Sequence, residues 1–293
     1  MEKPINRITL RARMRTYKKH PLSFLILLIA ALAALITVGV FLALVGHILI
    51  KGIPHLSPRL FEWEYNSENV SMMPAMINTL LTMLLTLLLA VPLGVCAAVY
   101  LVEYARRGNR LVSLIRLTAE TLSGIPSIVY GLFGYLLFNV TLRFGYSILS
   151  GALTLAIMVL PTVMRTTEEA LLAVPDSYRE GSFGLGAGRL RTVFHVILPS
   201  AASGVFSGIM LAIGRIVGET AALIYTAGTV TAVAKGLFTS GATLSVHMYV
   251  LLSEGFYTEE AYATAVVLLV SVILINALSS LISKKASSKK GTL

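Results

Sequence analysis

Two charged residues, Arg215 and Glu219, interrupt a run of the sequence that otherwise lacks Asp, Glu, Lys and Arg. The run extends over residues 192–234. Ionised side chains are costly to bury in apolar surroundings, so such residues serve a specific structural or functional purpose. A guanidinium offers a planar fork of donors that suits bidentate contact with an oxyanion. Arg215 is therefore the first candidate for chemistry in this chain.

Two interpretations of this pair remain open. Arg215 and Glu219 at i and i+4 on one helix would form a structural ion pair. Alternatively, Arg215 lines the path of an anion, and Glu219 holds it in place or accepts a proton from a protonated oxyanion, which a fully ionised oxyanion cannot offer. Arg165 is a further candidate for this path, or else a flanking positive charge.

Small residues share the helical face of Arg215. At 100° per residue, Gly204 and Gly208 lie within about 20° of it. Gly204 with Gly208, and Gly214 with Gly218, form two small-x-x-x-small pairs that let another helix approach closely. Arg215 lies about a dozen residues past Ser203, roughly 18 Å along a helix, which predicts a position near the middle of a bilayer.

The composition predicts that these residues lie in membrane-spanning helices. Of 293 residues, 56% are hydrophobic and 13% charged, whereas soluble domains carry about a quarter charged residues. Runs of about twenty apolar residues cross a bilayer as helix. We expect six: 22–50, 75–102, 121–142, 144–164, one within 192–234, and 261–283. The single cysteine, Cys96, excludes a disulfide framework, and no metal site is expected.

The basic residues predict the topology. Nineteen of the 24 Lys and Arg residues lie in the first twenty residues, the loops after the second and fourth runs, and the C-terminal end. Both termini are therefore expected in the cytoplasm. This divides the chain into a basic N-terminus (1–21), a transmembrane region (22–284) and a basic tail (285–293). The net charge of +10 thus reflects topology and not nucleic-acid binding.

Two further segments carry weaker signals. Pro126 marks the point where an amphipathic segment enters the third run. The stretch 236–255 is expected to form an interfacial or re-entrant helix and not a seventh span.

The predicted inner loop around residues 173–200 contains helix start and stop signals. Pro175 can end the fourth helix, and a short helix of about two turns can follow over 178–185. Gly186 and Gly188 suit a sharp exit at positive φ. The loop therefore predicts a short helix across the inner face.

This loop resembles the coupling loop of binding-protein-dependent ABC permeases. The family pattern is Glu-Ala-Ala, three residues, Gly, nine residues, Ile, one residue, Leu-Pro. Glu180, Gly186, Leu198 and Pro199 fall at those spacings, with Gly-Ser replacing the two alanines and Val196 replacing Ile. The resemblance implies an all-α, six-helix type I importer permease whose short helix docks in a groove of an ATPase, with Tyr178 and Phe183 as aromatic anchors.

A wider resemblance, over about 119–228, is to the phosphate-permease subunits of these importers. It implies a bacterial inner-membrane protein, a second homologous permease chain, two ATPase subunits that use ATP and Mg²⁺, and an external phosphate-binding protein. It also implies the path assignment of Arg215 and Glu219. No Walker A sequence or other catalytic motif is present, so we expect neither ATP hydrolysis nor a cofactor in this chain. Transport of sulfate or molybdate, or secondary anion transport, remains the alternative.

Overall fold

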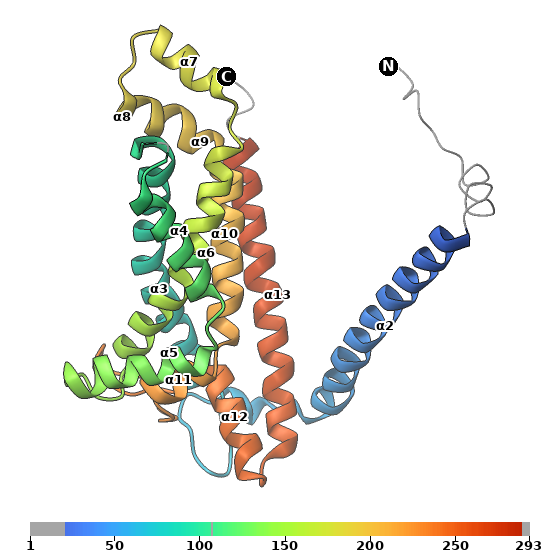
Figure 1. The fold of residues 1–293 in the computed structure, drawn as a ribbon. Helices are drawn as coiled ribbons and strands as arrows, with labels where there is room; N and C mark the ends of the chain where they lie inside the picture. The colour runs from blue at the N-terminus through green and yellow to red at the C-terminus, as the bar shows by residue number, and fades with distance from the viewer. Residues whose placement is uncertain (1–20, 107, 289–293) are drawn as a thin grey trace. The chain divides into compact units, whose positions relative to one another are not determined.

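The structure is a computed structural model that describes residues 21–106 and 108–288, and every regular element in these ranges is helical (Figure 1). The chain falls into two units, residues 1–51 and 52–293. The first unit contains most of helix α2 (Pro21–Gly52), whose 32 residues are enough to cross a bilayer. The predicted basic segment 1–20 and residues 289–293 lie outside the described residues.

The second unit is a helical bundle with three π-helical segments. Its elements are η1 (Ile53–His55), η2 (Pro58–Phe61), α3 (Met73–Val99), η3 (Tyr100–Tyr104), α4 (Arg110–Ser123), α5 (Ser127–Gly134), η4 (Tyr135–Thr141), α6 (Ile148–Leu172), α7 (Asp176–Gly184), α8 (Arg189–Thr192), η5 (Val193–Ile197), α9 (Leu198–Ser200), α10 (Ala202–Gly218), α11 (Ala221–Thr226), α12 (Leu244–Glu254) and α13 (Thr258–Ser288). The π-helical segments are η3, η4 and η5. Helix α13 extends to Ser288, four residues into the predicted tail.

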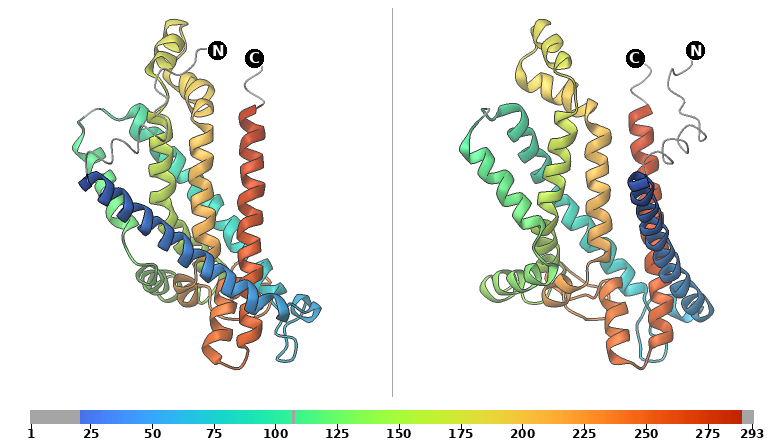
Figure 2. Two further views of the ribbon diagram at one scale, coloured as in Figure 1. Left: turned by 90° about the vertical axis from the view of Figure 1, so that its right-hand side faces the viewer. Right: turned by 45° about the vertical axis from the view of Figure 1, so that its right-hand side comes forward.

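Helix α6 forms the centre of this bundle, with α3 and α10 packed along it (Figures 1 and 2). Its Leu155, Met158 and Val159 are completely buried. They share a core with Ala90 of α3 and Ala212 of α10. The hydrophobic effect of burying these side chains therefore fixes three predicted spans against one another.

The third predicted span, 121–142, is wrong as a single helix. The chain bends by 103° between α4 and α5. Pro126 has no N–H to donate and lies in extended conformation, with φ −59° and ψ 141°, so it ends the helix. The hydroxyl of Tyr130 donates to the Leu122 carbonyl at 2.8 Å and supplies a partner near the break.

Within the described residues, four helices are long and apolar enough to span a membrane. The number reaches six when each bent pair, α4 with α5–η4 and α8–α9 with α10, counts as one span. Helix α12 has only 11 residues, too few to cross a bilayer. The expectation that 236–255 is not a seventh span is therefore confirmed, and the interfacial or re-entrant placement of its helix stays a prediction.

The two glycine pairs of α10 differ in their surroundings. A Cβ atom at Gly204 would lie 2.5 Å from the Cβ of Ala170, and one at Gly208 would overlap the side chain of Thr166. Both neighbours belong to α6, so this pair lets α6 and α10 approach closely. A Cβ atom at Gly214 or Gly218 would have no described atom within 4 Å. This second pair faces open space in the described chain.

Helix α12 buries a histidine beneath the segment that precedes α3. His247 is 2% exposed, packs edge-on against the Tyr65 ring at 6.0 Å, and forms a hydrogen bond with the Val70 backbone. Burial lowers the pKa of His247 to about 4, because the imidazolium would lose its hydration. The ring is therefore neutral in the folded protein at pH 7.

We predict that Gly208→Ala destabilises the purified protein, because the added methyl group forces α10 away from α6. Gly214→Ala on the same helix is the control. It should be neutral or stabilise by about 0.5–1 kcal/mol, because alanine favours a helix and nothing obstructs its methyl group. Thermal unfolding in detergent measures both, and equal melting temperatures for the two variants would contradict the packing.

A second prediction concerns pH. The unfolded chain binds a proton at residue 247 near pH 6.5, whereas the folded chain does so only near pH 4. The contribution of His247 to stability is thus complete above about pH 6.5 and declines as the pH falls toward 4, by up to about 3 kcal/mol. Thermal unfolding from pH 7.5 to 5 should show this decline, and His247→Gln should reduce it. The control is His195→Gln, at an exposed position, and it should leave the dependence of the melting temperature on pH as in the wild type. If His247→Gln also leaves that dependence unchanged, His247 is not its source.

Candidate functional site

Helix α10 carries Arg215 and ends three residues later, at Gly218. Glu219 follows in extended conformation, with φ −73° and ψ 127°. Its carboxylate oxygen Oε1 accepts a hydrogen bond from the Ala222 N–H at 3.1 Å, at the start of α11. Its backbone carbonyl accepts one from the Ser245 hydroxyl of α12 at 2.6 Å. Glu219, which is 9% exposed, therefore joins the ends of three helices.

The interpretation that Arg215 and Glu219 form an ion pair on one helix is wrong. The helix ends between them, and the Glu219 carboxylate is engaged by the backbone. In the described part of the chain, Arg215 forms neither an ion pair nor a hydrogen bond; it is half-buried and interacts electrostatically with Tyr130 of α5. With Gly214 and Gly218 beside it, its guanidinium is available to a ligand or to another chain.

Arg165 has different surroundings. Its side chain is exposed, and its Nε lies 3.3 Å from the Glu169 carboxylate on the same helix. A second carboxylate, that of Glu120 on α4, lies 3.9 Å away. The neighbouring Thr166 packs against Gly208, seven residues and about 10 Å along α10 from Arg215. Arg165 and Arg215 are therefore separated by about two turns along α10, and of the two only Arg165 has carboxylate partners in the described chain.

The predicted short helix of the inner loop is present as α7. Its aromatic side chains Tyr178 and Phe183 are 51% and 45% exposed, and Leu185 after it is 91% exposed. Glu180 is also exposed. Gly186 has φ +80°, as expected, so it permits the sharp exit from the helix. A solvent-facing helix that exposes two aromatic side chains, with an exposed leucine directly after it, suits docking to a partner.

One detail of this loop differs from expectation. Gly188 has φ −72° and ψ 162°, an ordinary extended conformation, because Gly186 alone makes the reversal. Leu198 and Pro199 form the single turn α9, which follows the π-helical segment η5. The chain then bends by 66° into α10, so the Leu-Pro pair lies at the junction between loop and span.

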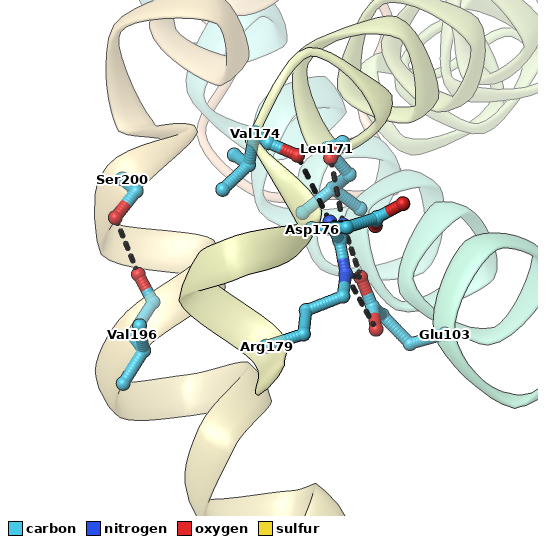
Figure 3. A network of polar contacts seen from close by, with 7 residues as sticks. All are labelled: Glu103, Leu171, Val174, Asp176, Arg179, Val196 and Ser200. Carbon is cyan, nitrogen blue, oxygen red and sulfur yellow. Dashed lines mark hydrogen bonds and ion pairs between the residues drawn. The ribbon is translucent and has the colours of Figure 1, made fainter. Parts of the chain in front are cut away.

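Arg179, a basic residue whose only signal in the sequence was topological, organises this loop (Figure 3). Arg179 of α7 binds the Glu103 carboxylate of η3, with Nη2 at 2.8 Å and Nε at 3.1 Å from Oε1. The same guanidinium donates to the Leu171 carbonyl in the last turn of α6 and to the Val174 carbonyl just after it, at 3.0 and 2.9 Å. The hydrogen bond to Glu103 raises the pKa of Arg179 above its ordinary value. A lone acidic residue at the end of the second apolar run was the available sequence signal.

The fold has the architecture of type I ABC importer permeases. It matches a chain of a bacterial alginate ABC transporter with a TM-score of 0.67 at 14% identity, over 93% of this chain and 97% of that one. It matches a chain of the MetNI methionine ABC transporter with a TM-score of 0.57 at 19% identity, over 73% and 94% of the two chains.

The chain belongs to the family described as binding-protein-dependent transport system inner membrane component, whose model matches residues 90–288. It is 34% identical to the probable ABC transporter permease protein YqgI of Bacillus subtilis, over 85% of this chain and 89% of that protein. It is 36% identical to the phosphate transport system permease protein PstA 1 of Mycobacterium tuberculosis, over 68% and 66%. It is 32% identical to PstA of Pasteurella multocida, over 78% and 82%. It is therefore a multi-pass permease of the ABC importer class.

The geometry at the end of α10 predicts that only one of its two charged residues contributes to stability. Arg215→Gln should leave the melting temperature unchanged, because no buried carboxylate loses a partner. Glu219→Leu should destabilise by about 1–2 kcal/mol, because the Ala222 N–H loses its acceptor. Glu219→Gln keeps an acceptor oxygen and serves as the matched control. A loss of about 3–5 kcal/mol in Arg215→Gln would indicate a buried ion pair instead.

Proposed function

We propose that this chain is a permease subunit through which an ATP-driven importer carries inorganic phosphate into the cytoplasm. The observation that carries the proposal is the Arg215 guanidinium, which lacks a carboxylate partner in the described chain and lies between glycines that face open space. Such a group can replace part of the hydration shell of an oxyanion through bidentate hydrogen bonds. The similarity to proteins named phosphate transport system permeases supports phosphate as the anion.

In this proposal Glu219 acts indirectly. By accepting from the Ala222 N–H and the Ser245 hydroxyl, it fixes the end of α10 and therefore the height and direction of Arg215. Because its Oε1 already accepts a backbone N–H, the other carboxylate oxygen is the one that could accept a proton from phosphate. Arg165, which is paired with two carboxylates, contributes to the positive inner flank and not to anion binding.

The partners follow from the same assignment. A second, homologous permease chain completes the pore beside the open face of α10. Two ATPase subunits bind at α7 and hydrolyse ATP with Mg²⁺, so this chain is not itself catalytic, and an external binding protein delivers phosphate. Both termini are cytoplasmic in this arrangement. In support, the end of α13 lies at the same end of the bundle as α7–α9 (Figure 2).

A second candidate function is the import of another oxyanion such as sulfate or molybdate. The guanidinium of Arg215 suits any tetrahedral oxyanion, and the relative in Bacillus subtilis carries no substrate in its name. The two candidates differ in which anion competes for uptake.

Uptake of labelled phosphate by the reconstituted complex tests the proposal. Wild-type uptake should require ATP and withstand an excess of sulfate or molybdate. Arg215→Gln should abolish uptake while the complex still assembles, and Arg215→Lys should retain an intermediate rate because it keeps the charge but loses the planar fork. Arg165→Gln is the control and should transport normally. Full uptake by Arg215→Gln, or equal competition by sulfate, would overturn the proposal.

A further inference from the structure

The ion pair between Arg179 and Glu103 connects the docking helix α7 to a helix distant from it in sequence. The two side chains are 16% and 8% exposed, so the pair is shielded from water. The carboxylate belongs to η3, the π-helical continuation of α3, whereas the guanidinium belongs to the loop that follows α6. The contact therefore links segments 76 residues apart.

All three nitrogens of Arg179 are engaged. Besides Glu103, they bind the Leu171 and Val174 carbonyls at the end of α6 and the exposed carboxylate of Asp176 at 3.0 Å. A lysine ammonium cannot reproduce this planar fork. One side chain therefore holds η3, the end of α6 and α7 in a fixed arrangement.

A second contact joins the other arm of the loop to the same π-helical segment. The Arg189 guanidinium of α8 lies over the Tyr104 ring, 5.5 Å from its centroid. The hydroxyls of Ser182 and Thr192, 2.8 Å apart, connect α7 to α8. The two arms of the loop are thus bound to each other, and each is bound to η3.

This arrangement gives α7 a lateral connection to the bundle core. Along the chain, α7 connects only to α6 and, through α8 and α9, to α10. Through Arg179 and Glu103 it also connects to α3, which packs along α6. A π-helical turn often marks a functional or strained position within a helix, and η3 lies at the point where this connection enters α3.

We propose that Glu103 and Arg179 are positioning residues that transmit displacement of α7 to α3 when the ATPase changes its nucleotide state. The proposal rests on the proposed docking of an ATPase at α7, but it does not depend on which anion is transported. It predicts that α3 moves with α7 only while the ion pair is intact.

Cys96, the single cysteine of the chain, provides a reporter for this movement. It is exposed on α3, seven residues or about 10 Å before Glu103. In the full complex, assembled with cysteine-free partners, the rate of N-ethylmaleimide labelling is measured with ADP and with ATP plus vanadate. We expect a several-fold difference in the wild type and loss of that difference in Glu103→Gln.

Asp176→Asn is the matched control. Asp176 binds the same guanidinium, but its carboxylate is 73% exposed and belongs to α7 itself, so removing its charge leaves the connection to α3 intact. This variant should keep the nucleotide-dependent labelling. If Glu103→Gln fails to assemble, Glu103→Asp preserves the charge with a shorter side chain, and its difference between nucleotide states should be reduced.

ATPase co-purification and phosphate uptake separate the two proposals. Uptake should fall strongly in Glu103→Gln while the ATPase still binds and hydrolyses ATP. A wild-type complex whose labelling rate differs between the two nucleotide states, but which does not carry phosphate, contradicts only the proposed substrate. If wild-type labelling is the same in both states, or if Glu103→Gln keeps the wild-type difference, the ion pair does not transmit movement and the inference is overturned.

Discussion

A chain that leaves helical geometry inside an apolar bundle must provide new partners for its freed backbone groups, and this constraint accounts for several of the buried polar residues here. An unsatisfied buried donor or acceptor costs about 1–3 kcal/mol. Asn78 binds the backbone of residues 232, 234 and 242 in the irregular segment before α12. Asn139 donates to two carbonyls at the end of α11. Glu219 accepts the Ala222 N–H at the start of α11, so each of these breaks has its own polar partner.

The same constraint explains the state of Arg215. Because the backbone engages Glu219, the arginine four residues earlier has no carboxylate beside it in the described chain. The bundle in this way stabilises its broken helices and leaves one guanidinium available next to the open glycines of α10. The hydrogen bond that the backbone needs from Glu219 is therefore also the reason why the Arg215 guanidinium can bind an anion.

Arg179 satisfies the constraint at the other end of the bundle. It provides donors for two carbonyls at the C-terminal end of α6 and at the same time pairs with Glu103. Helix ends are favourable places for cations, because their free carbonyls carry partial negative charge. The loop that displays Tyr178 and Phe183 is consequently fixed to both α6 and η3, while its aromatic face stays exposed.

The sequence by itself determined the membrane class, the approximate spans and the short helix α7, because apolar runs, proline and glycine act locally on helix formation. It also predicted the close packing at Gly204 and Gly208, since helical periodicity places small residues on one face. Only the tertiary structure decided that α10 ends before Glu219 and that Glu103 meets Arg179. Both outcomes depend on partners distant in the chain: the Ser245 hydroxyl for one, and a carboxylate 76 residues away for the other. Periodicity reports which face of a helix a residue occupies, but not whether that helix continues or what another segment brings to it.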